Sequence, residues 1–437
     1  MLFEKLSSNL SSMTSVLLRG GVVIDTDPSP TVLGVSDVLV RDGVIAAVGP
    51  ALPAETGTEV IDASGTIVLP GFVDTHRHTW QSGIRAILPD STLPAYLERV
   101  FYAISPRYEA RDVHAGVLGG ALECLDSGIT TLLDWSHIQH TPAHTDANVE
   151  ALKASGIRFV FGYAYPVTGD AGTMAIEARR VLREHFGDDR RSMAIAAFGP
   201  EIAGAERGVA EWRLARELGL PVSAHMGGRD TESAERGIAV LERAGLLTHP
   251  ATYIHANHYA DEAFKRIAAS GGSVSVTPTS ETMLNIGYPP TGRARAAGLP
   301  TSLSGDTVAS GPGDMFSLMR AAYMFERVRP DGAGLGFTTR DVLCMATIEG
   351  AETLGLGDVT GSLRPGKQAD LVMLRTDTLG MASAHDPIAA VVLCADTKSV
   401  DTVLVGGRIV KRGGRLLGHD IPAVLADIAE SAARVGR

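Results

Sequence analysis

Short apolar runs, most of which end in a polar residue, alternate with longer stretches of helical periodicity through the middle of the chain. The apolar runs are Thr66–Asp74, Thr130–Asp134, Arg158–Tyr163, Met193–Phe198, Pro221–His225, Ala251–His255, Ser273–Thr277 and Thr301–Asp306. The helical stretches are Val113–Asp126, Ala147–Ala154, Thr173–His185, Val209–Leu218, Glu232–Ala244 and Asp261–Ser270. Apolar strands that alternate with helices indicate a parallel sheet covered on both faces. The eight runs predict an α/β fold with a closed, TIM-like (β/α)8 barrel.

The two ends of the chain have a different pattern, with short β-type runs separated by turn signals such as Asp42-Gly43 and Gly406-Gly407. Each end alone is too small to bury a core, so we expect the two to form one small β-sandwich domain beside the barrel. The predicted units are a flexible leader (1–13), the first part of the sandwich (14–68), the barrel (69–359), and the second part of the sandwich with a C-terminal helix (360–437).

Composition and charge narrow the class of protein. Hydrophobic residues make up 45% of the 437 residues, and the formal net charge is −11. An acidic chain of this kind is unsuited to a nucleic-acid or anionic-membrane partner, and no apolar run reaches the roughly 20 residues of a membrane span. The first thirteen residues lack the apolar core of a signal peptide. Three widely spaced cysteines fit reduced thiols, so we expect a cytoplasmic protein.

The most specific chemical signal is the pair His76 and His78 at the end of the first apolar run. Residues i and i+2 on a strand point to the same side, so both imidazoles are predicted to face the mouth of the barrel. Two neutral imidazoles suit zinc or iron(II). An isolated HxH arises by chance more often than not, but its place after an apolar strand favours a metal site.

Further polar residues close other predicted strands. His225 ends the fifth run, His255 the sixth, and Asp306 the eighth. Catalytic groups of such barrels gather at the C-terminal ends of the strands. A lone histidine in this position is more often a hydrogen-bonded structural residue, yet four strand ends that together supply histidines and a carboxylate predict a metal centre.

The segments PGFVDTHRH, SAH, HANH, SGD and GSLRPGKQADLVML together resemble the amidohydrolase superfamily. The branch that looks most similar contains cytosine and guanine deaminases, S-adenosylhomocysteine/methylthioadenosine deaminases and triazine chlorohydrolases. The resemblance runs from about Val16 to about Leu417. It implies a metal-dependent hydrolase.

The resemblance also implies roles for individual residues. It makes metal ligands of His76, His78, His225 and Asp306. His255 would polarise the leaving group or the bound water, and Asp306 would also accept the proton of the water. Relatives with two metals bridge them with a carboxylated lysine at a strand end, and none of the six lysines here closes a predicted barrel strand. One divalent ion is therefore expected, zinc or alternatively iron.

The chain departs from this branch after the fifth strand. The deaminases usually carry HxxE there, and their glutamate protonates the ring of the substrate. Here Gly228 stands in the place of the acid. Glu281, after the seventh strand where the family usually has asparagine, and Glu201, after the fourth, are the candidate replacements. The simpler alternative for each is an exposed loop carboxylate.

Three further residues, Trp80, Gln81 and Trp135, follow or end strands near the predicted ligands. We expect them to line the substrate site, although Trp80 would serve equally well in packing.

The expected activity is deamination of a nitrogen heterocycle or a related small molecule by a metal-activated water. Two alternatives stay open. The first is hydrolysis of an amide, a cyclic amide or a carbon–halogen bond, which needs no HxxE acid. The second is a catalytically silent barrel that binds a ligand, which the missing glutamate would explain but the five intact site residues oppose. A small-molecule substrate and a homo-oligomeric assembly are expected.

Overall fold

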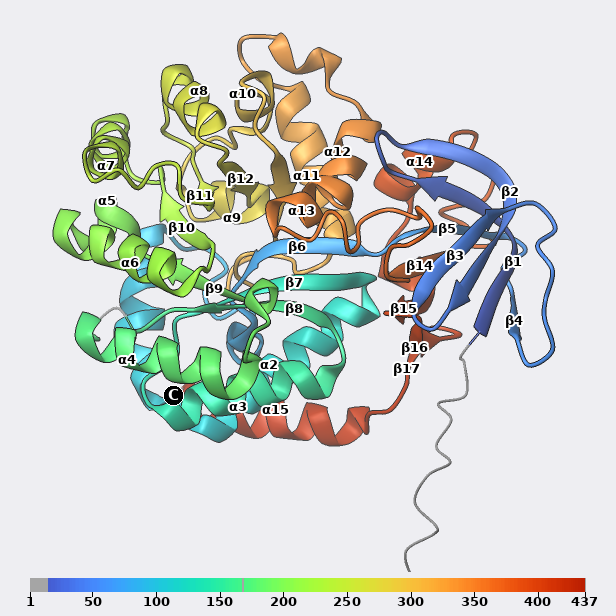
Figure 1. Cartoon of the computed structure of the whole chain (residues 1–437), viewed down its shortest axis with the longest axis horizontal. Coiled ribbons are helices and arrows are strands. Elements are labelled where there is room, and N and C mark those ends of the chain that lie inside the picture. Colours follow the sequence, from blue (N-terminus) through green and yellow to red (C-terminus); the bar gives the residue numbers. More distant parts are fainter. Residues whose placement is uncertain (1–14, 167–168, 437) are drawn as a thin grey trace, which may run out of the picture.

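The computed structural model describes residues 15–166 and 169–436, which form a barrel and, beside it, a sheet built from both ends of the chain (Figure 1). The barrel strands are β6 (Phe72–Arg77), β7 (Ile129–Ser136), β8 (Arg158–Tyr163), β9 (Met193–Ala197), β10 (Val222–Met226), β11 (Ala251–His255), β12 (Ser273–Val276) and β13 (Thr301–Leu303). They pair in parallel and in chain order. The predicted barrel is confirmed.

The barrel closes between its first and last strands through the residues that follow them. A parallel bridge joins Arg77 to Asp306. The Asp306 N–H donates to the carbonyl of His76 at 2.9 Å, and the His78 N–H donates to the carbonyl of Asp306 at 2.8 Å. The three residues that make these two hydrogen bonds, His76, His78 and Asp306, are also among the metal ligands that the sequence predicts.

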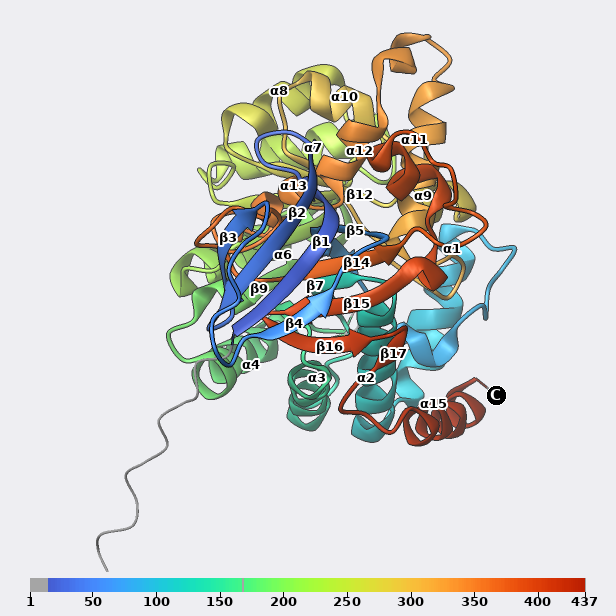
Figure 2. The same ribbon diagram turned by 90° about the vertical axis from the view of Figure 1, so that its right-hand side faces the viewer.

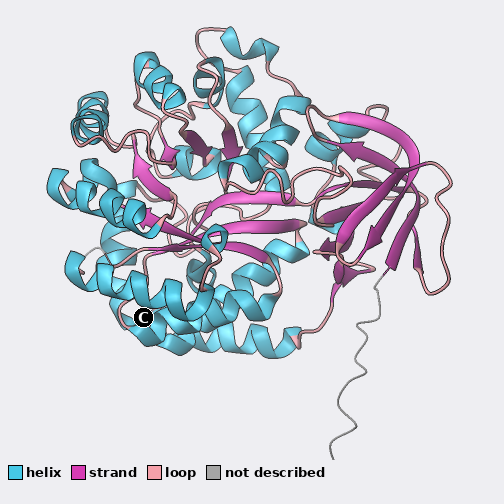
Figure 3. Ribbon diagram, in the orientation of Figure 1, coloured by secondary structure: helices cyan, strands magenta, loops and turns pink. Residues whose placement is uncertain are grey.

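Helices surround the barrel strands (Figure 3). The longer ones are α2 (Ala110–Asp126), α3 (Pro142–Ser155), α4 (Ala171–Val181), α6 (Ala205–Leu218), α7 (Thr231–Arg243), α8 (Asp261–Ala269), α11 (Met315–Arg327) and α15 (Ile421–Val435). Shorter helices are α1 (Leu93–Tyr96), α5 (Gly199–Ala203), α9 (Pro278–Met283), α10 (Thr291–Ala296), α12 (Thr339–Met345), α13 (Ile348–Thr353) and α14 (Pro387–Ala389). None of the described helices has the length and apolar character needed to span a membrane.

Side chains at the helix ends explain where several of these helices begin and stop. The Asp230 carboxylate accepts a hydrogen bond from the Ser233 N–H at 2.7 Å and caps α7. Helix α6 ends at Gly219, whose φ of 67° is the left-handed conformation that terminates helices. At the C-terminus, α15 packs against α2 on the outside of the barrel (Figure 1).

The chain ends form one nine-stranded sheet in the order β17-β16-β15-β14-β5-β1-β2-β3, with β4 paired to β1 (Figure 2). Its strands are β1 (Ser15–Asp25), β2 (Thr31–Arg41), β3 (Val44–Gly49), β4 (Glu59–Asp62), β5 (Thr66–Pro70), β14 (Leu371–Arg375), β15 (Val400–Val405), β16 (Arg408–Arg412) and β17 (Arg415–Leu416). The sheet encloses an apolar core of its own, to which β1, β2, β5 and β14 all contribute. The two ends therefore join as predicted, although hydrogen bonds connect them as a single sheet.

The first predicted run, Thr66–Asp74, proves to be two strands that belong to different sheets. Strand β5 pairs with β14 and β1, whereas β6 opens the barrel. The chain crosses between the sheets at Gly71, where a Cβ atom would overlap Oγ1 of Thr130. Only glycine fits so close an approach. The change of sheet thus comes two residues after the boundary expected at residue 69, and the predicted leader (1–13) lies outside the described residues.

Candidate metal centre and active-site cavity

Four side chains from the C-terminal ends of the barrel strands converge at one point. His76 and His78 come from the end of β6, His225 from β10, and Asp306 from the residues after β13. One nitrogen or oxygen atom from each lies within 4.8 Å of the others. Oδ1 of Asp306 is 3.1 Å from Nε2 of His76 and 3.2 Å from Nε2 of His78. The structure brings together the four residues expected to be metal ligands.

This donor set fits one divalent cation. Zinc binds histidine nitrogen and carboxylate oxygen at about 2.0–2.2 Å in tetrahedral geometry, which separates adjacent ligand atoms by roughly 3.3 Å. The two Asp306–histidine distances are close to this value. Three imidazoles and one carboxylate are also a donor set that zinc accepts. The residues present therefore fit the ion that the sequence predicts.

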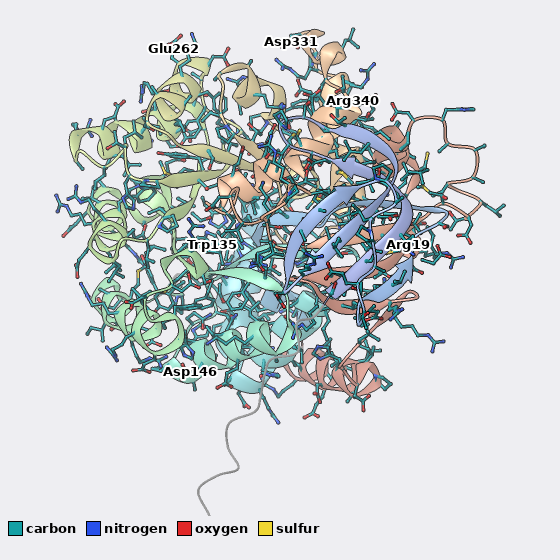
Figure 4. All side chains as sticks on the ribbon, turned by 45° about the vertical axis from the view of Figure 1, so that its right-hand side comes forward. Arg19, Trp135, Asp146, Glu262, Asp331 and Arg340 are labelled. Atoms are coloured by element: carbon teal, nitrogen blue, oxygen red, sulfur yellow. The ribbon has the colours of Figure 1, made fainter. Side chains whose placement is uncertain are left out.

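Hydrogen bonds hold the ligands in the orientation that coordination needs. Nδ1 of His78 donates to the backbone carbonyl of Trp135 at 2.7 Å, which leaves the Nε2 lone pair for a metal. The Trp135 ring packs against His225 at a centroid distance of 4.3 Å. Figure 4 places Trp135 in the interior of the molecule, whereas charged residues such as Glu262 lie at its periphery. Trp135 thus supports the ligands from behind.

The backbone is strained at two residues of the site. Asp306 has a φ of 53° and His255 a φ of 72°, both in the left-handed region that residues other than glycine rarely occupy. Such conformations persist where the surrounding structure over-determines them, and they gather at functional sites. Asp306 and His255 both contribute side chains to the wall of the site.

Burial and hydrogen bonding set the charge state of the ligands. Burial lowers the pKa of His76 to about 3, so its imidazole is neutral at physiological pH. For Asp306, burial acts to raise the pKa, but the hydrogen bonds with His76 and His78 outweigh it and hold the pKa well below its usual range. Neutral imidazoles around an ionised carboxylate are the protonation state in which these groups bind a metal.

His255 ends β11 next to the four candidate ligands, and its ring lies 5.5 Å from that of His225. Its Nδ1 is 2.9 Å from Oγ1 of Thr277 and 3.5 Å from Oε1 of Glu281. Glu281 is fully buried, and its Oε1 accepts a hydrogen bond from the Thr277 N–H at 2.8 Å. The carboxylate of Glu281 therefore lies behind His255.

A cavity of about 440 Å³ opens over this group of residues. Its polar lining consists chiefly of His78, His137, His225, His255, Asp306, Glu201 and Arg229, and the apolar lining includes Leu93, Leu97, Phe101, Phe198, Ile202, Met226, Leu284 and Ile286. Three of the candidate ligands, His78, His225 and Asp306, thus form part of a wall whose other residues are mostly apolar or aromatic. That combination is typical of a small-molecule site.

Glu201 belongs to the helix α5 that follows β9, and it lines the cavity. Both carboxylate oxygens accept from the Gly227 N–H, at 2.9 and 2.8 Å, and Oε1 lies 3.3 Å from the hydroxyl of Tyr259. Burial raises the pKa of Glu201 to about 7. This carboxyl group can therefore hold a proton near neutral pH.

Trp80 and Gln81, expected to contact substrate, are fully buried and lie behind the cavity wall, as does Trp135. The amide of Gln81 donates to the hydroxyl of Tyr96 at 2.6 Å, and the indole of Trp80 donates to Nδ1 of His137 at 3.1 Å. These two partners, Tyr96 and His137, line the cavity. Direct contact of the first three residues with substrate remains a prediction.

Two features of the wall escaped the sequence reasoning. His137 follows Trp135 by two residues, just after β7 ends, so the alternation of side chains was a signal that could have placed His137 at the site beside Trp135. Phe101 and Leu97 belong to the segment between β6 and α2, which has no strand periodicity and no metal-ligand motif. No sequence signal there indicates that the segment covers the cavity.

Gly228, in the place of the family's acid, lines the cavity as expected from its position after His225. A Cβ atom built on Gly228 would meet Ile286 at 3.8 Å and His255 at 4.0 Å, both ordinary contacts. The space for a longer side chain is therefore present, and the residue that would fill it is missing.

Comparison with known proteins identifies the family. The model of the amidohydrolase family matches residues 67–410, which include the barrel and all the candidate ligands. The chain belongs to the amidohydrolase family. A 5-methylthioadenosine/S-adenosylhomocysteine deaminase of Desulforudis audaxviator is 31% identical to this amidohydrolase over 437 residues, covering 96% of this chain and 99% of that protein.

Solved structures share the fold of this amidohydrolase. An adenosine deaminase from Xanthomonas campestris with bound zinc has a TM-score of 0.85 at 24% identity, covering 97% of this chain and 98% of that one. An atrazine chlorohydrolase from Arthrobacter aurescens complexed with zinc has a TM-score of 0.87 at 22% identity, covering 95% and 100%. This amidohydrolase thus has the fold of these structures, a TIM barrel with an accompanying sheet.

Proposed function

We propose that this amidohydrolase deaminates a nitrogen-heterocyclic small molecule at a single zinc ion. The observation that carries the proposal is the convergence of His76, His78, His225 and Asp306 at the floor of an apolar cavity. Deaminase names among the relatives, including a 5'-deoxyadenosine deaminase from Methanothermobacter thermautotrophicus at 28% identity, support this reaction type.

The residues of the chain divide the work of hydrolysis. When bound, the cation supplies Lewis acidity and makes hydroxide available near neutral pH. Asp306 is ionised and is therefore able to accept the proton of the attacking water and pass it to the leaving amine. His255 lines the cavity with Nδ1 occupied by Thr277, so its Nε2 is the nitrogen left to hydrogen-bond the reacting group.

Protonation of the heterocycle needs a group other than the missing acid. We assign Glu281 a positioning role, because it lies behind His255 and acts on the substrate only through that ring. We assign Glu201 the role of proton carrier, since it lines the cavity and its pKa of about 7 suits proton exchange at neutral pH.

A second candidate reaction is hydrolysis of a carbon–halogen bond or a cyclic amide. The observation that favours it is Gly228, which leaves the position of the ring-protonating acid without a side chain. In these reactions Asp306 alone is able to move the proton.

Elemental analysis and a hydrolase screen test the proposal. We expect about one zinc per chain in purified protein, loss of both metal and activity in His76→Ala, and release of ammonia from aminopurines, aminopyrimidines or amino-s-triazines. Release of chloride from chlorotriazines without ammonia from any amine would favour the second reaction. Full activity in metal-free protein would overturn both.

We also propose a cytoplasmic location. All three cysteines are free: Cys124 and Cys344 are buried thiols and Cys394 is exposed. Unpaired thiols are typical of a reducing compartment.

A further inference from the structure

His137 has a polar atom in the cavity wall that no described residue uses. The side chain is only 1% exposed and lines the cavity. Its Nε2 atom is buried and has no hydrogen-bond partner in the part of the chain that the structure describes. Because buried polar groups are nearly always paired, an unused nitrogen on a side chain that lines a cavity points to a ligand.

The partner of the other ring nitrogen fixes which atom carries the proton. The indole Nε1–H of Trp80 lies 3.1 Å from Nδ1 of His137. An indole can only donate, so Nδ1 must accept and the proton of the neutral ring must be on Nε2. His137 therefore carries an N–H donor that no described residue accepts, on a side chain that lines the cavity.

The position of this donor relates it to the reacting end of the substrate. The His137 ring is stacked on His78 at a centroid distance of 4.1 Å and an interplanar angle of 16°. Phe101 packs edge-on against the same ring at 4.4 Å. An atom bound by His137 would thus lie near His78, one of the candidate metal ligands.

The rest of the wall offers few competing polar groups. The carboxylate of Glu201 is bonded to Gly227, and the hydroxyl of Tyr96 is bonded to Gln81. The apolar side chains at the mouth include Leu97 and Ile202, which are 38% and 49% exposed. Such a wall suits a flat ring with apolar substituents, and it makes the His137 donor one of a few polar contacts in the wall, beside His255, Glu201 and Arg229.

We propose that Nε2–H of His137, held in this tautomer by Trp80, donates a hydrogen bond to an acceptor atom of the substrate, and that the substrate is a compact heteroaromatic ring whose acceptor is a ring nitrogen or carbonyl oxygen. This inference rests on the proposed function, because it names the chemistry of the substrate at the same site. His137 is then a specificity-determining residue.

Matched pairs of probes that differ in one acceptor test this role. Adenine is compared with 3-deazaadenine and 7-deazaadenine, and melamine with 2,4,6-triaminopyrimidine, since each analogue replaces one ring nitrogen by C–H. The full-length, zinc-loaded enzyme is used, with KM measured for probes that turn over and calorimetric Kd for those that do not. The analogue that lacks the nitrogen bound by His137 should bind about tenfold more weakly than its parent compound.

Variants of His137 connect that preference to the side chain. His137→Phe keeps a ring stacked on His78 but has no donor. The parent compound and its analogue should therefore bind to this variant about equally well. His137→Gln restores an N–H donor and should retain most of the preference for the parent compound. Phe101→Leu, which changes packing against the same ring without removing a polar atom, should weaken both members of each pair equally. Zinc content and melting temperature confirm that each variant is folded.

The outcomes separate this inference from the proposed function. An equal preference in wild type and His137→Phe, or binding of none of the probes, overturns the role of His137. If ammonia is released but the preference does not depend on His137, the proposed function is supported and the role of His137 is overturned. A His137-dependent preference without ammonia from any amine supports the inference and overturns deamination.

Discussion

At the scale of single residues, the proposed catalysis depends on which side chains accept and donate protons. The four candidate metal ligands lie together, but Gly228 leaves the position of the family's usual acid without a side chain. Glu281 and Glu201 occupy different positions relative to the cavity, one behind His255 and one in the wall. Their substitution should therefore have different effects on catalysis.

Asp306→Asn keeps the shape of the side chain but removes its capacity to accept a proton. Turnover should fall by ~10² or more. The measurement is kcat together with zinc content, because Asp306 is also a candidate ligand. Asp358→Asn, at an exposed carboxylate paired with Arg191, is the matched control. Near-normal kcat with zinc retained would show that another residue accepts the proton.

Glu281→Gln should lower kcat by about 10² with little change in KM or zinc content, since the carboxylate positions His255 and does not reach the cavity. Steady-state kinetics with an ammonia assay measures the effect. A change confined to KM would place Glu281 in direct contact with substrate and contradict the positioning role.

The raised pKa of Glu201 predicts how kcat and the stability of the fold depend on pH. Burial raises the pKa of Glu201 from the ordinary value of 4.5 to about 7. If its proton is used, kcat falls as pH rises above about 7, and Glu201→Gln lacks this limb. The same shift stabilises the folded state fully below pH 4.5 and is lost as pH rises through about 7.

The melting temperature of wild type should therefore decline over this interval more than that of Glu201→Gln. Glu206→Gln, an exposed carboxylate in the neighbouring helix α6, serves as control. Identical pH profiles for kcat in wild type and Glu201→Gln would exclude Glu201 as the proton carrier.

At the scale of elements, the junction between β5 and β6 decides how the two sheets meet. Gly71 lies against Thr130 at the start of the barrel, with no room for a side chain. A continuous apolar run hid this change of sheet from sequence reasoning, because strands of either sheet are apolar where both faces are buried.

Gly71→Ala should destabilise the fold by about 1–3 kcal/mol, since the added Cβ overpacks the contact with Thr130. Thermal unfolding followed by circular dichroism measures it. Gly49→Ala is the matched control, because a Cβ built there meets no atom within 4 Å. Equal melting temperatures for the two variants would contradict the close approach.

At the scale of the whole molecule, the barrel and the terminal sheet are joined by a buried ion pair. Arg158, at the start of β8, makes two hydrogen bonds to Asp370, at 2.6 and 3.0 Å, just before β14. The Asp370 carboxylate is almost fully buried and also accepts from the Gly406 N–H at 2.6 Å. The contact holds two parts of the chain together that are distant in sequence.

Asp370→Ala leaves the Arg158 guanidinium without its partner in a largely buried position. The free energy of unfolding should fall by roughly 3–5 kcal/mol. Denaturant titration gives the value. Asp377→Ala removes an exposed partner of Arg375 and should change it by less than about 1 kcal/mol. A similar small loss in both variants would show that the pair contributes little to joining the two parts.

The sequence predicted the elements whose signals are local. Apolar runs marked the barrel strands, and residue types at their ends marked His76, His78, His225 and Asp306. The features that the sequence could not predict depend on packing between elements that are distant along the chain. The burial of Glu281 behind His255, and the covering of the cavity by the segment around Phe101, arise from contacts between elements that no periodicity records.

The hydrogen bonds that close the barrel run through the backbone of the residues that would hold the metal. The amide of Asp306 bonds to His76, and that of His78 bonds to Asp306. During synthesis, a growing chain has neither a finished barrel nor an assembled site until residue 306 has left the ribosome and returned to β6. The barrel is therefore completed and the candidate metal site assembled in the same step. A partly synthesised chain cannot bind a metal in the native arrangement.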